Sequence, residues 1–315
     1  MKRNSSTPLR RIKEGDVYYL YNQLTKNKHT LNGHSGAIYS IASDHQFIYS
    51  ASADKFVVRW NAETGEQDKF AIKFDFTAYS ICLFSENSVL TVGLASGDLH
   101  IFDIKERKEL KFYTQHKKGI FAISENAHTS QLYVGDADGN LSVWNTKTLE
   151  LIIYLPFDCG KIRKIIPSMD GSQFFIAAQD GDIRIIDSTT FNETARFFAH
   201  KDGATSLLQL SKHELISGGK DAHLKIWDLA TNNLLKSIPA HNFVIYDLLR
   251  LNDTQFVTAS RDKSIKIWDI KSMNVIARLE RKQGGHQHSV NQLVRLSDSE
   301  FASCSDDATI CIWQV

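Results

Sequence analysis

The stretch GKDAHLKIWDLATN, residues 219–232, recurs in closely similar form as SRDKSIKIWDIKSM, residues 260–273. In both copies an aspartate stands six residues before a tryptophan, as Asp221 before Trp227 and Asp262 before Trp268. The three remaining tryptophans share this spacing: Asp54 precedes Trp60, Asp138 precedes Trp144 and Asp307 precedes Trp313. A motif that returns at a constant spacing indicates a fold built from repeated units.

The distances between the tryptophans define the number of repeats. Successive tryptophans are separated by 84, 83, 41 and 45 residues, so two gaps are about twice the length of one repeat. Phe102 in SGDLHIFDI and Ile186 in DGDIRIIDS lie near the middle of these two gaps. Seven repeats of about 41 residues are therefore predicted, with equivalent positions at 60, 102, 144, 186, 227, 268 and 313.

Each repeat has the pattern of short β-strands. In SLLQLSKHELISGGKD, residues 206–221, two apolar stretches are separated by a polar break. Asp-Lys, Asp-Gly or Asp-Ala pairs before the tryptophan strand are typical of tight hairpin turns. About 41 residues accommodate four strands of five or six residues with their turns. The chain has only four prolines and no extended helical period, so an all-β fold is predicted.

The composition narrows the class of function. The chain has 315 residues, of which 42% are hydrophobic, and 37 basic residues nearly balance 36 acidic ones for a net charge of +1. This balance does not suggest a polyanion-binding surface, so no nucleic-acid partner is expected. The apolar runs are strand-sized, so no membrane span is expected. Four cysteines without a CxxC pair suggest a reducing, cytoplasmic location.

A histidine also recurs before the first strand of most repeats, in NGHSGAI, TQHKKGI, FAHKDGA, PAHNFVI and GGHQHSV. With S-x-S-x-D and I-x-I-W-D at the same period, the pattern resembles the WD-repeat β-propeller family. The resemblance covers residues 16–315, read as a single domain. It implies a seven-bladed propeller in which four-stranded antiparallel blades surround a central channel.

The ends of the propeller require a closing strand. The chain ends directly after the third strand of the last repeat, which would leave a blade with an open edge. NKHTLNGH, residues 27–34, matches the fourth-strand segment LKSIPAH, residues 235–241. The N-terminal strand is therefore predicted to complete the last blade. Residues 1–15, with five basic side chains, are predicted to form a flexible tail, and residues 16–26 receive no assigned role.

The resemblance implies a hydrogen-bonded chain in each blade, from the tryptophan indole through a hydroxyl and a histidine to the aspartate. A fully satisfied buried network of this kind fixes one geometry. The complete sets are His200–Ser217–Asp221–Trp227, His241–Thr258–Asp262–Trp268 and His286–Ser303–Asp307–Trp313. Repeat 1 offers His34, Ser50, Asp54 and Trp60, and repeat 3 offers His116, Asp138 and Trp144 with Val134 at the hydroxyl position. Repeat 2, with Ser96 and Phe102, and repeat 4, with Asp180 and Ile186, are predicted to rely on apolar packing alone.

Sets of serine, histidine and aspartate also occur in nucleophilic catalysis. A catalytic site is assembled once, whereas these sets recur with the repeat, so they are interpreted as structural and the chain as non-enzymatic. His286 and His288 form an H-x-H pair without a carboxylate or cysteine cluster, so no metal and no cofactor is predicted. The sequence leaves two possibilities for Cys304 and Cys311: a disulfide between them, or free buried thiols, which are the default in the cytosol.

In the family, partners usually dock on the face that carries the loop before each first strand, and two positions per blade reach the channel mouth there. The first set is Tyr39, Tyr79, Phe121, Arg163, Thr205, Tyr246 and Asn291. The second set is Ala53, Ala95, Ala137, Gln179, Lys220, Arg261 and Asp306. Aromatic residues and arginine are typical of interface hot spots. The predicted partner-binding residues are Tyr39, Tyr79, Phe121, Arg163, Gln179, Lys220, Tyr246 and Arg261.

These positions suggest a class of partner. Arg163, Lys220 and Arg261 are expected across the opening from the aromatic residues, and Arg278, Arg281 and Lys282 are expected near the same mouth. The predicted partner is a protein or peptide with an aromatic or apolar anchor beside an acidic residue. Three alternatives remain: the aromatic residues only fill the channel, the chain docks through its rim as an accessory subunit, or the mouth is an enzyme pocket.

Overall fold

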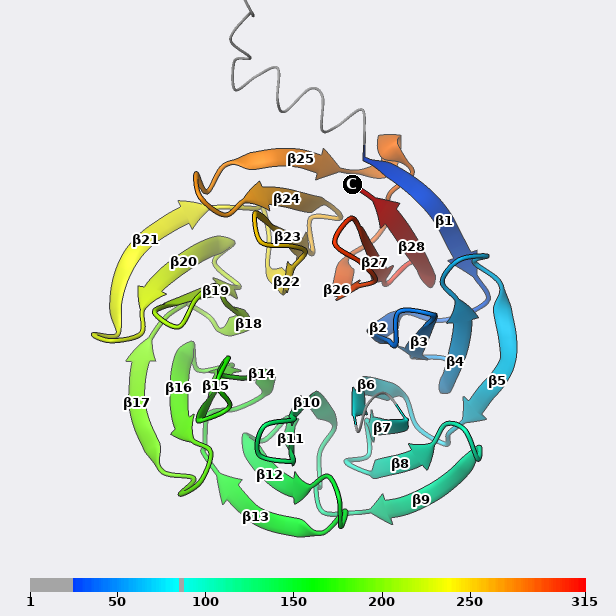
Figure 1. Cartoon of the computed structure of the whole chain (residues 1–315), viewed down its shortest axis with the longest axis horizontal. Helices are drawn as coiled ribbons and strands as arrows, with labels where there is room; N and C mark the ends of the chain where they lie inside the picture. The colour runs from blue at the N-terminus through cyan, green and yellow to red at the C-terminus, as the bar shows by residue number, and fades with distance from the viewer. Residues whose placement is uncertain (1–24, 85–87) are drawn as a thin grey trace, which may run out of the picture.

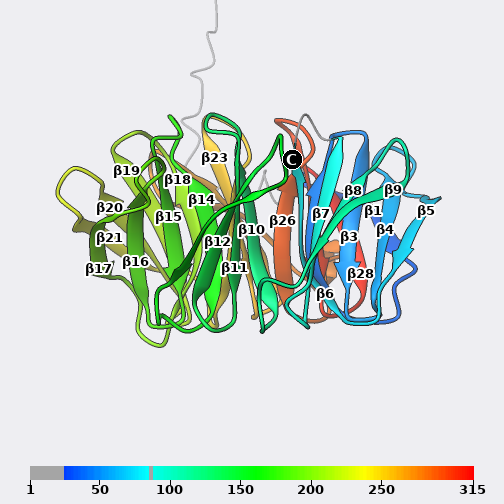
Figure 2. The same cartoon turned by 90° about the horizontal axis from the view of Figure 1, so that it is seen from below.

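The computed structural model describes residues 25–84 and 88–315. Its strands form seven four-stranded antiparallel sheets arranged in a ring around a central axis (Figures 1 and 2). In each sheet, or blade, the first strand lies next to the axis and the fourth lies at the rim (Figure 1). The prediction of a seven-bladed all-β propeller is confirmed.

The strand bounds follow the repeat. Blades 1 to 3 comprise β2 (Ile38–Ser43), β3 (Phe47–Ser52), β4 (Phe56–Asn61) and β5 (Gln67–Lys73); β6 (Ala78–Phe84), β7 (Val89–Leu94), β8 (Leu99–Asp103) and β9 (Lys108–Tyr113); and β10 (Ile120–Asn126), β11 (Gln131–Asp136), β12 (Asn140–Asn145) and β13 (Leu151–Pro156). Blades 4 to 6 comprise β14 (Ile162–Pro167), β15 (Gln173–Ala178), β16 (Asp182–Asp187) and β17 (Glu193–Phe198); β18 (Ala204–Gln209), β19 (Glu214–Gly219), β20 (His223–Asp228) and β21 (Asn233–Pro239); and β22 (Ile245–Arg250), β23 (Gln255–Ser260), β24 (Ile265–Asp269) and β25 (Val275–Leu279). Blade 7 comprises β26 (Val290–Arg295), β27 (Glu300–Ser305), β28 (Thr309–Gln314) and β1 (Lys26–Asn32), and the short 3-10 helix η1 (Arg281–Gln283) precedes it.

The hydrophobic core lies between the blades. β-branched and aromatic residues favour these strands, and their side chains alternate between the two faces of a blade. Ile48 and Trp60 of blade 1, for example, share one buried cluster with Ile310 and Ile312 of blade 7. Tyr49 and other residues on the opposite face of blade 1 pack in the next cluster, which includes strands of blade 2. Each blade is therefore held by both of its neighbours.

The N-terminal strand closes the ring, as predicted. β1 pairs antiparallel with β28, with Lys26 opposite Gln314 and Asn32 opposite Thr309, and so completes blade 7 (Figure 1). Leu31 of this strand is buried in the cluster between blades 7 and 1. The first and last described strands are thus neighbours in one sheet.

Polar side chains of the first strands connect neighbouring blades near the axis. Ser40 Oγ accepts a hydrogen bond from the backbone N–H of Ile81 at 3.1 Å, which joins blade 1 to blade 2. Gln292 of blade 7 accepts from the N–H of Ile41 at 2.9 Å. In a further connection, Asp247 of blade 6 pairs with Lys164 of blade 4 at 2.7 Å and also accepts from the N–H of Leu293 in blade 7. These contacts hold the first strands of different blades together around the axis.

Two interpretations fall outside the described residues: the flexible tail of residues 1–15, and residues 16–24 at the beginning of the predicted domain. No helix in the part of the chain that the structure describes is long and apolar enough to cross a membrane.

Candidate functional site

The hydrogen-bonded chain implied by the repeat is seen in full in blade 1. The indole N–H of Trp60 donates to Ser50 Oγ at 2.8 Å, Ser50 Oγ lies 2.8 Å from His34 Nε2, and His34 Nδ1 lies 2.8 Å from Asp54 Oδ2. One tautomer of the histidine satisfies every member, with the Nδ1–H donating to the carboxylate. The same chain occurs in the sets His200–Ser217–Asp221–Trp227, His241–Thr258–Asp262–Trp268 and His286–Ser303–Asp307–Trp313.

Blade 3 contains the chain in a different form, and the prediction for it is wrong in two residues. His116 Nδ1 contacts Asp136 Oδ2 at 2.8 Å rather than Asp138, which is exposed in the turn. The hydroxyl is that of Ser142, 2.7 Å from His116 Nε2 and 2.7 Å from the Trp144 indole nitrogen. Ser142 stands opposite Val134 in the sheet, so the hydroxyl has moved to the third strand. Asp136 occupies the end of the second strand and is completely buried.

Blade 4 does not rely on apolar packing alone, contrary to the prediction. Arg184, whose side chain is 2% exposed, occupies the cross-strand position that Ser142 has in blade 3. Its guanidinium pairs with Asp180 at 2.6 Å and with Glu193 at 3.5 Å. Blade 2 combines both kinds of contact, because the His100 ring packs against Phe74 and Phe102 while its Nδ1 lies 2.6 Å from Glu109. In blades 2, 3 and 4 the polar contact is thus made by the residue two positions before the tryptophan position. These residues are His100, Ser142 and Arg184.

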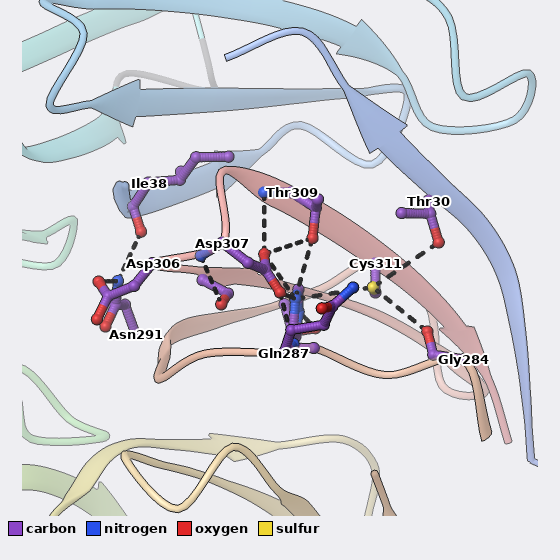
Figure 3. Close-up of polar contacts among 12 residues, drawn as sticks. Thr30, Ile38, Gly284, Gln287, Asn291, Asp306, Asp307, Thr309 and Cys311 are labelled. Atoms are coloured by element: carbon purple, nitrogen blue, oxygen red, sulfur yellow. Dashed lines mark hydrogen bonds and ion pairs between the residues drawn. The ribbon is translucent and has the colours of Figure 1, made fainter. Parts of the chain in front are cut away.

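The pKa of the blade 7 histidine, His286, is shifted in the opposite direction to that of His200 and His241. His286 Nδ1 lies 3.3 Å from Asp307, 3.1 Å from Thr309 Oγ1 and 3.9 Å from Cys311 Sγ. Figure 3 labels these three partners. Burial opposes the charged imidazolium, but the hydrogen bonds with Asp307 and Cys311 outweigh it and raise the pKa of His286 to about 9. In blades 5 and 6, burial is the larger effect and lowers the pKa of His200 and His241.

These opposite pKa shifts predict that the free energy of unfolding falls on both sides of an optimum pH. The pKa of His200 and His241 is lower in the folded protein than in the unfolded chain, so their contribution is lost as pH falls below about 6.5. His286 has a raised pKa, so its contribution is complete below about 6.5 and is lost as pH rises towards 9. We expect an alkaline loss of about 1–3 kcal/mol in urea unfolding between pH 6.5 and 9.5. His286→Gln should flatten this alkaline limb and leave the acid limb in place; an unchanged alkaline limb in the variant would contradict the assignment.

The mouth of the channel holds a cavity of about 460 Å³. All seven residues of the first predicted set line it, together with three further residues. The lining residues are Ala37, Tyr39, Tyr79, Phe121, Lys161, Arg163, Thr205, Tyr246, Asn291 and Asp306. Each first-set residue is the second residue of an innermost strand, so the seven blades place one such residue each at this end.

The aromatic residues of the mouth form a continuous series on blades 1 to 3. Tyr39 meets Tyr79 edge-on at 5.3 Å, and Tyr79 stacks on Phe121 at 4.5 Å between ring centroids. Gly119 makes this stack possible, because a side chain there would meet the Tyr79 ring at 3.0 Å. The three rings are partly exposed and line the cavity.

The cations lie against these rings rather than only across from them, which corrects the predicted arrangement. Lys161 Nζ lies 3.8 Å from the centroid of Phe121, and the Arg163 guanidinium lies 5.8 Å from it. Burial lowers the pKa of both side chains, and repulsion from Arg163 and Lys220 lowers that of Lys161 further. The Arg163 Nε is buried without a hydrogen-bond partner among the described residues. Lys161 is absent from the predicted set, although it stands only two residues before Arg163 in the sequence.

Gln179, Lys220 and Arg261 lie outside the cavity lining. Gln179 Oε1 accepts from the backbone N–H of Lys161 at 3.4 Å, and Lys220 packs beside Gly203. Arg261 covers the exposed ring of Phe243 at 6.0 Å. Of the second set, only Asp306 reaches the cavity, where it accepts a hydrogen bond from Asn291 at 2.8 Å.

The basic segment before blade 7 forms a separate hollow, which corrects its predicted position at the mouth. Arg281 and Lys282 line this hollow of about 840 Å³ with Asp262, Lys263, Glu280, His286, Gln287 and His288. Arg278 pairs with Glu280 at 2.7 Å. We refer to this site as the outer hollow.

The described part of the chain contains neither a disulfide nor a group of side chains suited to a metal ion. It contains no cluster of three or more histidine, cysteine, aspartate or glutamate side chains that could hold a metal ion. Cys82, Cys159, Cys304 and Cys311 are free thiols. Burial raises the pKa of Cys159 to about 11 and that of Cys82 to about 12, so neither is a ready nucleophile.

Comparison with known proteins places the repeat in a family. The WD40 profile, "WD domain, G-beta repeat", matches residues 25–61, 107–145, 191–228, 232–269 and 277–314. The unmatched stretches contain most of blades 2 and 4, the two blades without the tryptophan.

Curated relatives are distant. The chain is 23% identical over 208 residues to eukaryotic translation initiation factor 3 subunit I of Pongo abelii, covering 60% of this chain and 62% of that protein. It is 22% identical over 161 residues to human WD repeat-containing protein 36, covering 50% of this chain and 18% of that protein. It is 22% identical over 143 residues to U3 snoRNP-associated protein-like EMB2271 of Arabidopsis thaliana, covering 39% and 29%. The chain thus spans less than two thirds of the length of each of these relatives. The WD40 profile covers more than half of the chain, and each match runs from the outer strand of one blade through the first three strands of the next, so this protein belongs to the WD40-repeat family of β-propellers.

Proposed function

We propose that this protein is a non-enzymatic interaction module that binds a peptide segment of a protein partner at the mouth of its channel. The observation that carries the proposal is the mouth cavity, in which stacked aromatic rings adjoin two cations without an anionic partner among the described residues. The partner segment has an aromatic or apolar anchor beside an acidic residue.

The aromatic half of the cavity suits the anchor. Tyr39, Tyr79 and Phe121 offer flat apolar area, and their few rotatable bonds make their ordering inexpensive in entropy. Tyr246 adds a fourth ring from blade 6. The ring contacts hold these side chains before a ligand arrives, so binding costs little reorganisation.

The cationic half suits the acidic residue. Lys161 and Arg163 are partly desolvated, and mutual repulsion raises the free energy of the empty site. A carboxylate or phosphate placed between them would give Arg163 Nε the acceptor that it lacks. The one acid of the lining, Asp306, is already bonded to Asn291. The cavity therefore favours an anion and disfavours a cationic guest.

The surroundings support docking on this face. Phe76 and Phe243, in the loops that enter blades 2 and 6, are 50% and 56% exposed. Below the loop of Phe243, the chain from His241 through Thr258 to Trp268 stiffens this face, and a recognition surface requires such rigidity. Free thiols throughout the described chain agree with the cytoplasmic location that we propose.

A second candidate is docking through the rim as an accessory subunit. The outer strands of blades 2 and 3 expose Leu110, Phe112, Leu151 and Ile152 to solvent. Exposed large apolar side chains on neighbouring outer strands are common in protein interfaces. Eukaryotic translation initiation factor 3 subunit I is by its name a subunit of a larger factor, which is consistent with this role. An enzymatic pocket is not favoured, because the cavity lining offers Asp306 as its only carboxylate and no histidine.

Selection of binding peptides tests the proposal. Random ten-residue peptides displayed on phage and selected on the immobilised protein should converge on an aromatic or large apolar residue next to Asp or Glu. Tyr79→Ala and Arg163→Gln should each weaken the selected peptide by about 1–3 kcal/mol in calorimetry, the range of interface hot spots. Arg163→Gln should also reduce the dependence of binding on salt.

The matched control lies on the opposite face. Lys147 and Lys271 are exposed in the turns between the third and fourth strands of blades 3 and 6. Lys147→Gln/Lys271→Gln changes charge without touching the mouth and should bind as the wild type does. Loss of binding in this control, with both mouth variants unaffected, would place the site elsewhere.

A further inference from the structure

The last spacing between tryptophans is 45 residues, four more than the usual 41, and the additional residues form a short fixed insertion before blade 7. They contribute to η1, which Glu280 and Gln283 cap reciprocally and which Gly284 ends in the left-handed conformation at φ 78°. Asn27 of β1 donates to the Gly284 carbonyl at 2.6 Å. Cys311 Sγ of β28 lies 3.9 Å from the same oxygen (Figure 3). The backbone of the insertion is therefore bound to the two strands beside it.

The insertion presents cations that have no anionic partner among the described residues. Arg281 and Lys282 are exposed on η1, and Lys263 is exposed on the facing turn of blade 6. The carboxylates of the outer hollow are already engaged: Glu280 pairs with Arg278, and Asp262 binds His241 and the N–H of Asn242. A net charge of +1 for the whole chain shows that these cations are a local excess.

The outer hollow is adjacent to the mouth. His288 lines the outer hollow, and Asn291, three residues later, lines the mouth cavity. Three residues span at most about 10 Å of backbone, and four residues of an extended peptide span about 13 Å. A peptide anchored in the mouth can therefore place its third to fifth residues over the cations of the outer hollow.

We propose that the outer hollow is a second subsite that binds acidic side chains of the same peptide, two to four residues from its anchor. The proposal rests on the proposed function for the anchor, but the outer hollow itself is identified independently by its unpaired cations and its fixed insertion. A cationic surface without enclosure acts mainly on the rate of encounter and on the choice of partner. This subsite therefore selects partners with an acidic flank.

Four synthetic peptides test this inference by fluorescence anisotropy. YEEEE and YEQQQ both carry the anchor and the acid nearest to it, and they differ only in the distal acids. EEEEY and QQQEY are their reversed counterparts, because the peptide can run in either direction. At about 50 mM salt, the wild type should prefer the more acidic peptide of one pair by about tenfold, which corresponds to two weak charge contacts.

The variant Arg281→Gln/Lys282→Gln removes the cations of η1, and both side chains are exposed, so the fold should be retained with an unchanged Tm. Its preference should fall below about threefold while its affinity for the less acidic peptide stays that of the wild type. Lys147→Gln/Lys271→Gln, with the same change of charge, should keep the full preference. Tyr79→Ala should weaken both peptides equally and also keep the preference.

Each contrary outcome has a distinct meaning. A tenfold preference retained by Arg281→Gln/Lys282→Gln overturns the second subsite and leaves the mouth proposal standing. Unchanged binding of both peptides by Tyr79→Ala removes the mouth proposal, whereas the outer hollow is still judged by the preference. Failure of the wild type to bind any of the four peptides contradicts both. Binding of a twelve-nucleotide single-stranded DNA can be measured in the same way. If the wild type binds it and Arg281→Gln/Lys282→Gln does not, while the peptide preference is intact, the outer hollow is a nucleic-acid site and the inference is overturned.

Discussion

Deletion of residues 1–32 is expected to abolish soluble expression or to lower the free energy of unfolding by several kcal/mol. The deletion removes β1, leaves the edge of β28 unpaired and exposes the apolar cluster in which Leu31 is buried. Loss of the Leu31 side chain alone corresponds to about 2–5 kcal/mol. Soluble yield and the midpoint of urea unfolding measure the effect.

A pair of point variants separates the strand from the residues before it. Leu31 is 2% exposed, whereas its neighbour Asn32 is exposed on the same strand. Leu31→Asp should destabilise the protein by more than about 3 kcal/mol, because it buries a charge, and Asn32→Asp should stay within about 0.5 kcal/mol. A truncated protein with the melting temperature of the wild type would contradict ring closure by this strand.

Replacement of Asp136 is expected to be the most damaging single change in the polar networks. Asp136 accepts hydrogen bonds from His116, from the side chain and backbone of Asn140 and from the backbone N–H of Asp138. Asp136→Ala leaves these buried donors without an acceptor, and we expect a loss of about 2–4 kcal/mol in urea unfolding. Asp138→Ala, two residues away in the exposed turn, should change stability by less than about 0.5 kcal/mol.

The two aspartates form a matched test of the network in blade 3. Asp136→Asn keeps the shape and one acceptor oxygen, so it should recover part of the loss. Equal effects of Asp136→Ala and Asp138→Ala would mean that the histidine does not depend on a single carboxylate. Neither change should affect peptide binding at the mouth beyond what the loss of folded protein explains.

The sequence predicted the architecture because the architecture is periodic. The constant distance from Asp54 to Trp60, repeated in blades 5 to 7, reflects one hairpin of constant geometry, and a fixed offset finds it each time. The offset fails in blade 3 because residues opposite each other on two strands face the same space. Val134 and Ser142 are such a pair, and either strand can supply the hydroxyl. Only the folded sheet shows which one does.

The candidate site was predicted less completely for a different reason. Position in the repeat places the backbone of Tyr39 or Arg163 at the mouth, but it does not give the direction of a long side chain. Lys161 reaches the Phe121 ring from a loop position, whereas Arg261 turns outward to Phe243. The repeat period also does not predict where an insertion lies. The sequence places the extra residues near Arg281 at the mouth, whereas in the structure they lie beside β1, where Asn27 contacts Gly284.

The pairing of Lys26 with Gln314 also sets the order of events as the chain is made. Among the described strands, a ribosome releases β1 first and its partner β28 last, so all the strands between them must be synthesised before that sheet is complete. Until then β1 is an unpaired strand with an exposed edge, and six blades can stack before the ring is complete. Closure is a pairing between distant parts of the chain, which is slow because the intervening loop entropy is lost before any contact forms. Until β28 is made, the blades therefore form an open ring with unpaired strand edges, which are prone to aggregation. β1 is the described strand that stays unpaired for the longest time.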